Sequence, residues 1–260
     1  MEAKQGTGAA GPRQRTRSRA RRDKGKRLIT ARDRLVLTWI AQQYAARLDQ
    51  VRALLNRAPG RGGKALSPGG LTLSAVLQVV GRWVDLGLVS YERVYQREPG
   101  WIYLTALGLR RLQLPYAALI PAYSTLAHLY AINRVRLDLE DRHPEYRWVS
   151  ERTLRARQPR RGEGITPPHV PDAQVWQPKA IALEVERSPK SAQELDAILT
   201  ELLIAGTPSP PGEPPLVYTT VWYFVAESAR FPVEQARSRL PPSYQGRVKI
   251  LSLATLEPFA

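Results

Sequence analysis

The sequence contains no cysteine, which excludes disulfide bonds and zinc sites built from thiolates. Its three histidines, His128, His143 and His169, are scattered and cannot build a metal cluster by themselves. Acidic residues are also scarce, because 23 Asp and Glu stand against 39 Lys and Arg, for a formal net charge of +16. This excess predicts a polyanionic partner, most commonly nucleic acid. An anionic membrane surface or a merely arginine-rich composition are the alternatives.

Long apolar runs are lacking as well. No run approaches the ~20 residues that a membrane helix needs, and the N-terminus lacks the apolar core of a signal peptide. We therefore expect a cytoplasmic protein with no membrane partner. The 43% hydrophobic content and six Trp in 260 residues instead predict a packed body of one large or two modest domains.

Basic residues are concentrated at the N-terminus, where residues 1–27 carry ten basic and two acidic side chains. Arg15, Arg17 and Arg19 alternate with small or polar residues, and the segment offers nothing to bury. We expect a disordered basic arm that lies along DNA phosphates and adds salt-sensitive, sequence-independent affinity. A solubilising leader is the alternative.

Residues 28–115 predict a winged helix-turn-helix domain. The expected order is a helix from Thr30 to about Ala46, a short helix capped by Asp49, a third helix over 72–86, strands over 88–94 and 101–104, and a short helix capped by Thr105. Thr30 and Asp33 have the spacing of a capping box, and Gly87 is a left-handed helix stop. In the winged-helix arrangement the third helix enters the major groove and the hairpin touches the DNA backbone or minor groove.

The predicted third helix divides into two faces. Its inward face carries Val76, Leu77, Val80, Trp83 and Val84, and its outward face carries Ser74, Gln78, Arg82 and Asp85. Gln and Arg can make bidentate bonds to base edges, so Ser74, Gln78 and Arg82 are predicted DNA contacts, while Asp85 points away from the phosphates. A Gly-rich loop over 56–70 adds Arg57, Arg61 and Lys64. A protein-docking module with an ordinary solvated face is the alternative.

Residues 116–260 predict a second domain with the order α-β-β-β-α-β-α-β, so that the whole chain is of the α+β or α/β class. The expected elements are a helix over 122–141, strands over 146–149, 169–176 and 180–186, a helix over 190–203, a strand over 217–225, a helix over 233–239 and a strand over 248–253. A loop rich in Arg and Pro is expected between the first two of these strands.

Three carboxylates stand out on neighbouring predicted strands. Period-2 alternation places Glu184 and Glu186 on one face, where Asp172 from the adjacent strand can meet them. Carboxylates this close repel one another unless a cation neutralises them, and Mg²⁺ is held by one or two carboxylates together with water and phosphate. We therefore predict Asp172 and Glu184 as ligands of Mg²⁺, with Mn²⁺ as a substitute. Pairing with the surplus arginines is the alternative.

Residues 122–225 resemble the core of the PD-(D/E)XK nuclease superfamily, whose order is α-β-β-β-α-β. Pro171-Asp172 matches its PD and Glu184 its second acidic residue. Glu186 stands where Lys is usual, and Lys190 on the following helix is placed to substitute for it. The resemblance implies a metal-dependent DNA endonuclease with Asp172, Glu184, Glu186 and Lys190 as its catalytic set. Glu140 and Glu151 are open alternatives for a further acidic ligand, and a degenerate DNA-binding derivative is the alternative to an enzyme.

A second resemblance covers most of the folded chain. It rests on Thr30-Ala31-Arg32-Asp33, Tyr103-Leu104-Thr105, Leu126-Ala127-His128 with Asn133 and Val135-Arg136, Pro171-Asp172-Ala173, Ala182-Leu183-Glu184-Val185-Glu186 and Ser188-Pro189-Lys190-Ser191. Together these segments resemble the replication-relaxation family of bacterial plasmids and mobile elements.

That resemblance implies a role in plasmid replication and DNA relaxation, or in mobilisation. The implied partners are double-stranded DNA and other replication, mobilisation or transposition proteins. It also points His128 at the site as a phosphate contact, with an interhelical histidine as the alternative. A non-catalytic replication accessory factor and a transcriptional regulator are the competing functions, and the oligomeric state stays open.

Overall fold

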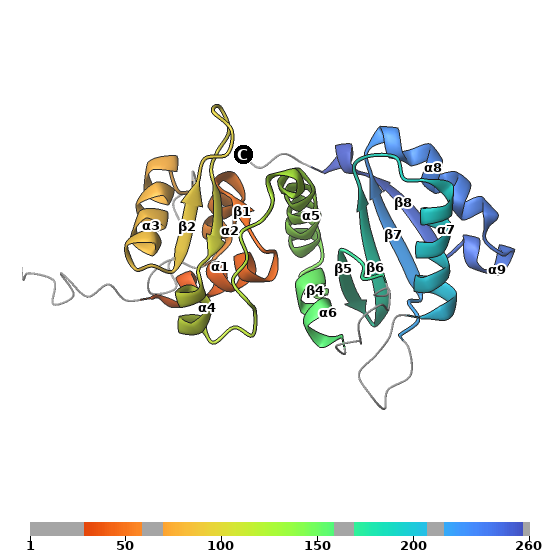
Figure 1. Cartoon of the computed structure of the whole chain (residues 1–260), viewed down its shortest axis with the longest axis horizontal. Coiled ribbons are helices and arrows are strands. Elements are labelled where there is room, and N and C mark those ends of the chain that lie inside the picture. The colour runs from red at the N-terminus through yellow and green to blue at the C-terminus, as the bar shows by residue number, and fades with distance from the viewer. Residues whose placement is uncertain (1–28, 59–69, 159–168, 207–215, 257–260) are drawn as a thin grey trace, which may run out of the picture.

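The computed structural model describes residues 29–58, 70–158, 169–206 and 216–256, which form an α+β structure with two sheets (Figure 1). The predicted arm, with Arg15, Arg17 and Arg19, lies outside these residues, and so do Arg61 and Lys64. Within the described ranges, no helix combines the length and the apolar character needed to cross a membrane.

The N-terminal unit consists of helices around a small sheet. Its elements are α1 (Ala31–Gln42), β1 (Ala46–Arg47), α2 (Leu48–Arg57), α3 (Leu73–Asp85), β2 (Val89–Glu92), β3 (Trp101–Leu104) and α4 (Ala106–Leu112). The strands are antiparallel in the order β1-β3-β2. The prediction missed β1 and extended the first helix too far, because the apolar period continues through Tyr44, whereas the backbone there turns left-handed with φ 65°.

Two predicted helix ends, the start of α1 and the end of α3, are confirmed. Thr30 Oγ1 accepts from the Asp33 amide at 3.1 Å, and Asp33 Oδ2 accepts from the Thr30 amide at 2.8 Å, which completes the capping box of α1. Gly87 takes φ +67° after α3. The Leu88 amide donates to the Trp83 carbonyl at 2.9 Å and the Gly87 amide to the Val84 carbonyl at 2.8 Å, which is the Schellman pattern.

The C-terminal unit is a mixed five-stranded sheet with helices on both faces. Its elements are α5 (Tyr123–Arg142), β4 (Arg147–Ser150), α6 (Glu151–Arg157), β5 (Ala173–Gln177), β6 (Lys179–Glu186), α7 (Ala192–Thr200) with a π-helical turn (Glu201–Ala205), β7 (Thr220–Val225), α8 (Glu227–Arg239), α9 (Pro242–Gln245), β8 (Val248–Ser252) and a 3₁₀ turn (Leu253–Thr255). The sheet order is β4-β5-β6-β7-β8, antiparallel from β4 to β6 and parallel from β6 to β8.

The main elements lie in the predicted order, with two differences of note. Residues expected to form a loop after β4 instead form α6, because the Ser150 side chain accepts from the Thr153 amide and caps a helix there. Helix α8 begins at Glu227 rather than near Val233, so that Pro232 lies inside the helix. The segment between α4 and α5 contains no helix or strand.

Helix α5 joins the two units, and Figure 1 shows it between the N-terminal unit and the large sheet. Its Ile132 and Val135 pack on one face of that sheet, whereas α7 and α8 cover the other face. On its opposite side, Leu137 belongs to the core of the N-terminal unit, and Leu126 packs with Trp101 of β3. Because α5 is buried on both sides, it fixes the sheet relative to the N-terminal unit.

Buried polar side chains of α5 strengthen this connection. Asn133 Nδ2 donates to the Ala45 carbonyl at 2.9 Å and to Gln50 Oε1 at 3.0 Å. The buried Arg136 donates to Glu140 at 2.7 Å and lies over the Trp39 ring, 4.5 Å from its centroid. Cutting any of these bonds leaves a buried polar group unpaired, which costs about 1–3 kcal/mol.

Candidate functional site

Three carboxylates converge at one end of the large sheet. Asp172 immediately precedes β5, and the register that pairs Ala173 with Leu183 sets Asp172 opposite Glu184 of β6. Glu186 lies two residues further along β6 on the same face. Asp172 Oδ2 accepts from the Val185 amide at 2.8 Å, which anchors the Asp172 side chain across the end of β6. We call these three residues the carboxylate cluster.

Each carboxylate of the cluster has a basic partner. His128 Nε2 of α5 lies 3.0 Å from Asp172 Oδ1, and His169 Nε2 lies 2.7 Å from Glu184 Oε1. Lys190, just before α7, forms an ion pair with Glu186. His128 and Lys190 were expected at the site and are in contact with it. His169 is a contact that the sequence does not predict, although it lies only three residues before Asp172.

Burial dominates the electrostatics of the cluster. Glu184 is only 2% exposed, and this burial raises its pKa to about 7 against the opposing hydrogen bond and charge of His169. Burial also raises the pKa of Glu186, against Lys190. Burial lowers the pKa of His169, but the hydrogen bond to Glu184 and the negative charges of Glu184 and Asp172 together outweigh this, and the net pKa is raised. The pKa values of both partners are therefore raised, that of Glu184 by its burial and that of His169 by its contact with the carboxylates.

Tyr223 adds a hydroxyl that the sequence did not reveal. It lies in β7 directly beside Glu184 in the parallel register and is fully buried. Burial, and then the charges of the cluster, raise its pKa well above the usual value, so it stays a neutral donor. Its hydroxyl has no hydrogen-bond partner within the described residues. A buried donor without a partner needs an explanation, and an absent acceptor at the site is one.

The donor chemistry of the cluster fits a divalent cation held by two carboxylates. Asp172 and Glu184 provide the oxygen ligands that Mg²⁺ takes, and the raised pKa of Glu184 reflects burial that the neighbouring His169 and Lys190 only partly offset. Both carboxylates are nevertheless bonded to histidines in this conformation. Across the described part of the chain, no three His, Asp or Glu side chains are grouped to hold a metal. Water and phosphate oxygens would have to complete the coordination.

The two further acidic candidates do not contact the cluster through their side chains. Glu140 accepts from Trp39 Nε1 at 3.0 Å and from Arg136, on the side of α5 that faces the N-terminal unit. Glu151 donates its amide to the Asp172 carbonyl at 3.1 Å, but its side chain pairs with Arg155.

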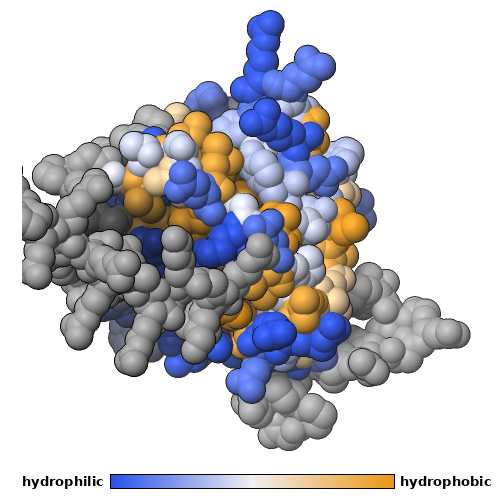
Figure 2. Space-filling view, turned by 90° about the vertical axis from the view of Figure 1, so that its left-hand side faces the viewer, coloured by the Kyte–Doolittle hydropathy of each residue, from blue (hydrophilic) through white to orange (hydrophobic). Residues whose placement is uncertain are grey.

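The outward face of α3 is more apolar than predicted. Ser74, Gln78 and Asp85 are exposed, but Val84, expected inside, is 42% exposed, and Leu77 is only half-buried. The reason is that the stripe of α3 facing the core is narrow, with Val76, Val80 and Trp83 as its buried residues. Figure 2 views the molecule from the α3 side and shows hydrophobic residues among hydrophilic ones.

Two arginines expected to meet DNA have internal partners. Arg82 donates to Asp33 Oδ1 at 2.7 Å, and this buried carboxylate also accepts from Trp83 Nε1 at 2.9 Å. Arg57 is the last residue of α2 rather than part of a loop, donates to the Leu137 carbonyl at 2.9 Å and pairs with Asp141. Both side chains thus support the fold, and their contact with DNA stays a prediction.

The chain matches no protein-family model, no curated protein and no solved structure. The chemistry of its own side chains therefore carries the functional interpretation.

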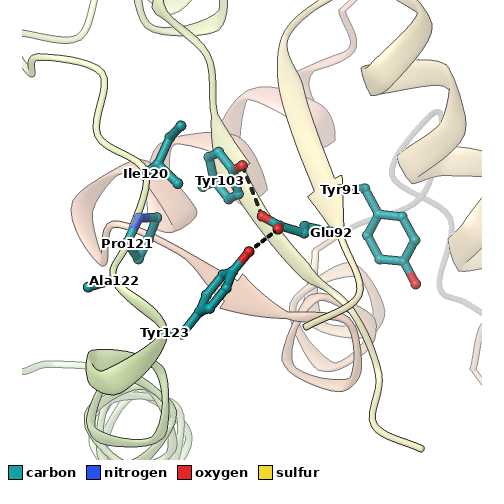
Figure 3. A pocket seen from close by; sticks show the side chains of 7 residues that line it. All are labelled: Tyr91, Glu92, Tyr103, Ile120, Pro121, Ala122 and Tyr123. Carbon is teal, nitrogen blue, oxygen red and sulfur yellow. Dashed lines mark hydrogen bonds between the residues drawn. The ribbon is translucent and has the colours of Figure 1, made fainter. Parts of the chain in front are cut away.

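A pocket of about 680 Å³ lies apart from the cluster, between the β2–β3 hairpin and residues 120–123 (Figure 3). At its centre, Glu92 accepts from the hydroxyls of Tyr103 and Tyr123. These bonds tie the hairpin to the start of α5. Because the carboxylate already has two donors, this pocket is a poor cation site.

Proposed function

We propose that this chain is a DNA-binding protein with a Mg²⁺-dependent DNA endonuclease site, acting in plasmid replication and relaxation or in mobilisation. The observation that carries the proposal is the convergence of Asp172, Glu184 and Glu186 with Lys190 at one end of a mixed sheet. The plasmid context rests on the resemblance to the replication-relaxation family.

The N-terminal unit supports the DNA-binding part of the proposal as a winged helix. Its order α1-β1-α2-α3-β2-β3 and its sheet order β1-β3-β2 are those of that fold, with β1 pairing with the second strand of the wing. In this arrangement α3 is the recognition helix and presents Ser74 and Gln78 to base edges. The net charge of +16 supplies the attraction to phosphates.

The C-terminal unit supports the nuclease part as a PD-(D/E)XK-like domain. The order α5-β4-β5-β6-α7-β7, antiparallel to β6 and then parallel, matches the core expected from the sequence, apart from the inserted α6. In this proposal, Asp172, which immediately precedes β5, and Glu184 in β6 would be the two acidic residues of the motif. Lys190, in the segment before α7, would be its basic residue.

Each side chain of the cluster has a distinct role in this proposal. Asp172 and Glu184 would hold Mg²⁺, which polarises a phosphoryl group and acidifies bound water when present. Lys190 places a positive charge beside the attacked phosphate, where it stabilises developing negative charge. His128 orients Asp172, and the unpartnered hydroxyl of Tyr223 is a neutral donor beside Glu184.

A specific observation favours a second candidate, a non-catalytic DNA-binding accessory factor or regulator. All three carboxylates already have hydrogen-bonded basic partners, so the cluster is electrostatically satisfied without a metal. In that case the cluster would be a structural ion-pair network.

Conversion of supercoiled plasmid to nicked or linear DNA in Mg²⁺ or Mn²⁺ separates the two candidates. We expect conversion by the wild-type chain and by Glu227→Gln, which alters an exposed carboxylate of α8, and none by Asp172→Asn or Glu184→Gln. All four proteins should shift duplex DNA equally in a gel. A wild-type protein that binds plasmid but leaves it intact with every divalent metal would rule out the endonuclease and leave the accessory factor.

A further inference from the structure

A second pocket, of about 400 Å³, lies between the β2–β3 hairpin and the first turns of α5. Basic and aromatic side chains dominate its lining, namely Arg47, Tyr95, Trp101, Tyr130, Arg134 and Arg187, and the carboxylate Glu98 also lines it. Its volume lies in the range of pockets that hold small molecules. The plasmid-cleavage site proposed above does not include it.

Two of the lining arginines have no carboxylate partner among the residues that the structure describes. Arg47 is committed to Asp49 at 2.8 Å and to Glu98 at 3.3 Å. By contrast, neither Arg134 nor Arg187 forms an ion pair with any carboxylate in the described ranges, and Arg134 donates only to the Leu256 carbonyl. Two uncompensated guanidinium groups around one pocket attract an anion, and their planar donor geometry suits phosphate.

The aromatic side chains add a surface for a flat ring. Tyr95 lies on the turn between β2 and β3, lines the pocket and is 48% exposed, so its side chain is accessible to a ligand. Trp101 forms a buried wall, and its Nε1 has no hydrogen-bond partner among the described residues. Aromatic rings beside basic groups are the usual means by which proteins hold single-stranded nucleic acid.

Two lining residues of the pocket are sequence neighbours of residues at the carboxylate cluster. Its lining residue Ala127 directly precedes His128, and its lining residue Arg187 directly follows Glu186. A nucleotide held there would therefore be a neighbour of the phosphodiester at the cluster. A base in a pocket of this size has left the duplex stack.

We propose that this pocket binds one unpaired nucleotide of a DNA strand, with Arg134 and Arg187 on its phosphate and Tyr95 against its base. The proposal rests on the proposed DNA-binding function and deepens it. It makes a single-stranded or locally opened segment the part of the DNA that is held beside the cluster.

Fluorescence anisotropy with a labelled 12-nucleotide single strand and a labelled duplex, both in EDTA, tests the pocket in the full chain. The test variants are Arg187→Gln and Tyr95→Ala. Their matched controls are Arg237→Gln and Phe231→Ala on α8, which covers the sheet face opposite α5. Thermal unfolding of each variant shows that the fold is retained.

We expect each pocket variant to bind the single strand roughly tenfold more weakly, as for loss of one stacking or charged contact. The controls should stay within about twofold of wild type, and duplex affinity should change less than single-strand affinity in the pocket variants. Single-strand affinities that match the controls would overturn the pocket while leaving DNA binding intact. Failure of the wild type to bind either DNA would overturn the DNA-binding function itself.

Competition with free dTMP identifies the source of the nucleotide. Weak or no displacement of the oligonucleotide supports a strand segment as the ligand. Tight dTMP binding that requires Arg187, together with unchanged oligonucleotide binding by Arg187→Gln, would overturn the strand segment and assign the pocket to free nucleotides.

Discussion

Replacing Glu184 with Gln should stabilise the protein in a pH-dependent way. Gln keeps the shape of the side chain and its ability to accept from His169, but it removes a buried negative charge. Burial raises the pKa of Glu184 from 4.5 to about 7. At about 1.4 kcal/mol per pKa unit, ionising this carboxyl in the folded protein costs about 3 kcal/mol at pH 8 relative to the unfolded chain.

The sign of this pH dependence follows from the protonation state of Glu184 that the folded protein favours. A carboxyl with a raised folded pKa contributes its full stability below the unfolded pKa of 4.5 and loses it as the pH rises through about 7. Wild-type stability should therefore fall across this range relative to Glu184→Gln. The advantage of the variant should be close to zero at pH 4, below about 1 kcal/mol at pH 5 and about 3 kcal/mol at pH 8.

Urea denaturation followed by Trp fluorescence at these three pH values measures the difference, with Glu227→Gln as the exposed control. A gain for Glu184→Gln that is constant with pH, or no larger than that of the control, would refute the electrostatic reasoning. Mg²⁺ provides a second readout, because an ion bound by Glu184 stabilises the wild type and not the variant. The advantage at pH 8 should therefore shrink as Mg²⁺ is added.

Three further predictions concern the rest of the molecule. Arg82→Ala should destabilise the fold by about 1–3 kcal/mol in urea denaturation, because the buried Asp33 loses its cation. Gln78→Ala should leave the stability unchanged. It should instead lower the discrimination between DNA sites by about 1–3 kcal/mol in competition binding. Equal stability of the two variants would contradict the Asp33 assignment. Deleting residues 1–27 should weaken binding to all sequences alike and reduce the slope of log affinity against log salt; an unaltered slope would exclude the arm from phosphate contact. Gly81→Ala should stabilise α3 by about 1 kcal/mol, since a Cβ there meets nothing within 4 Å. Gly108→Ala should destabilise the fold by more than that, since its Cβ would lie 2.0 Å from the Leu88 carbonyl oxygen. Thermal unfolding compares the two variants.

Local signals predicted the parts of the fold that depend on local bonds. The Thr30 capping box, the Gly87 stop and the strand Trp101–Leu104 all lie where the sequence placed them. The hydrogen bonds of the capping box and of the helix stop join residues close together in the chain. The strand is indicated by a short run of apolar and aromatic residues. Such features can be read without knowledge of the tertiary structure.

Elements stabilised by distant residues were missed. Strand β1 has two residues and exists through its pairing with β3, far along the chain. In α6, Arg152 donates to the Ala41 carbonyl, and its guanidinium lies 4.8 Å from the ring centroid of Tyr44 and 4.6 Å from that of Tyr116. From the sequence alone, an arginine-rich segment is predicted to be a solvated loop. A buried arginine needs partners for its charge, and here those partners lie far away in the chain.

Some features of the carboxylate cluster can likewise be predicted from the sequence, and others depend on the tertiary structure. The sequence by itself determined that Glu184 and Glu186 share a face of one strand, because side-chain alternation is a local property of β structure. Only the tertiary structure decided that His128, His169 and Lys190 meet the three carboxylates and that Tyr223 lies beside Glu184. Those contacts join α5, β5, β6 and β7 through long-range packing, and packing also sets the burial that raises the pKa of Glu184.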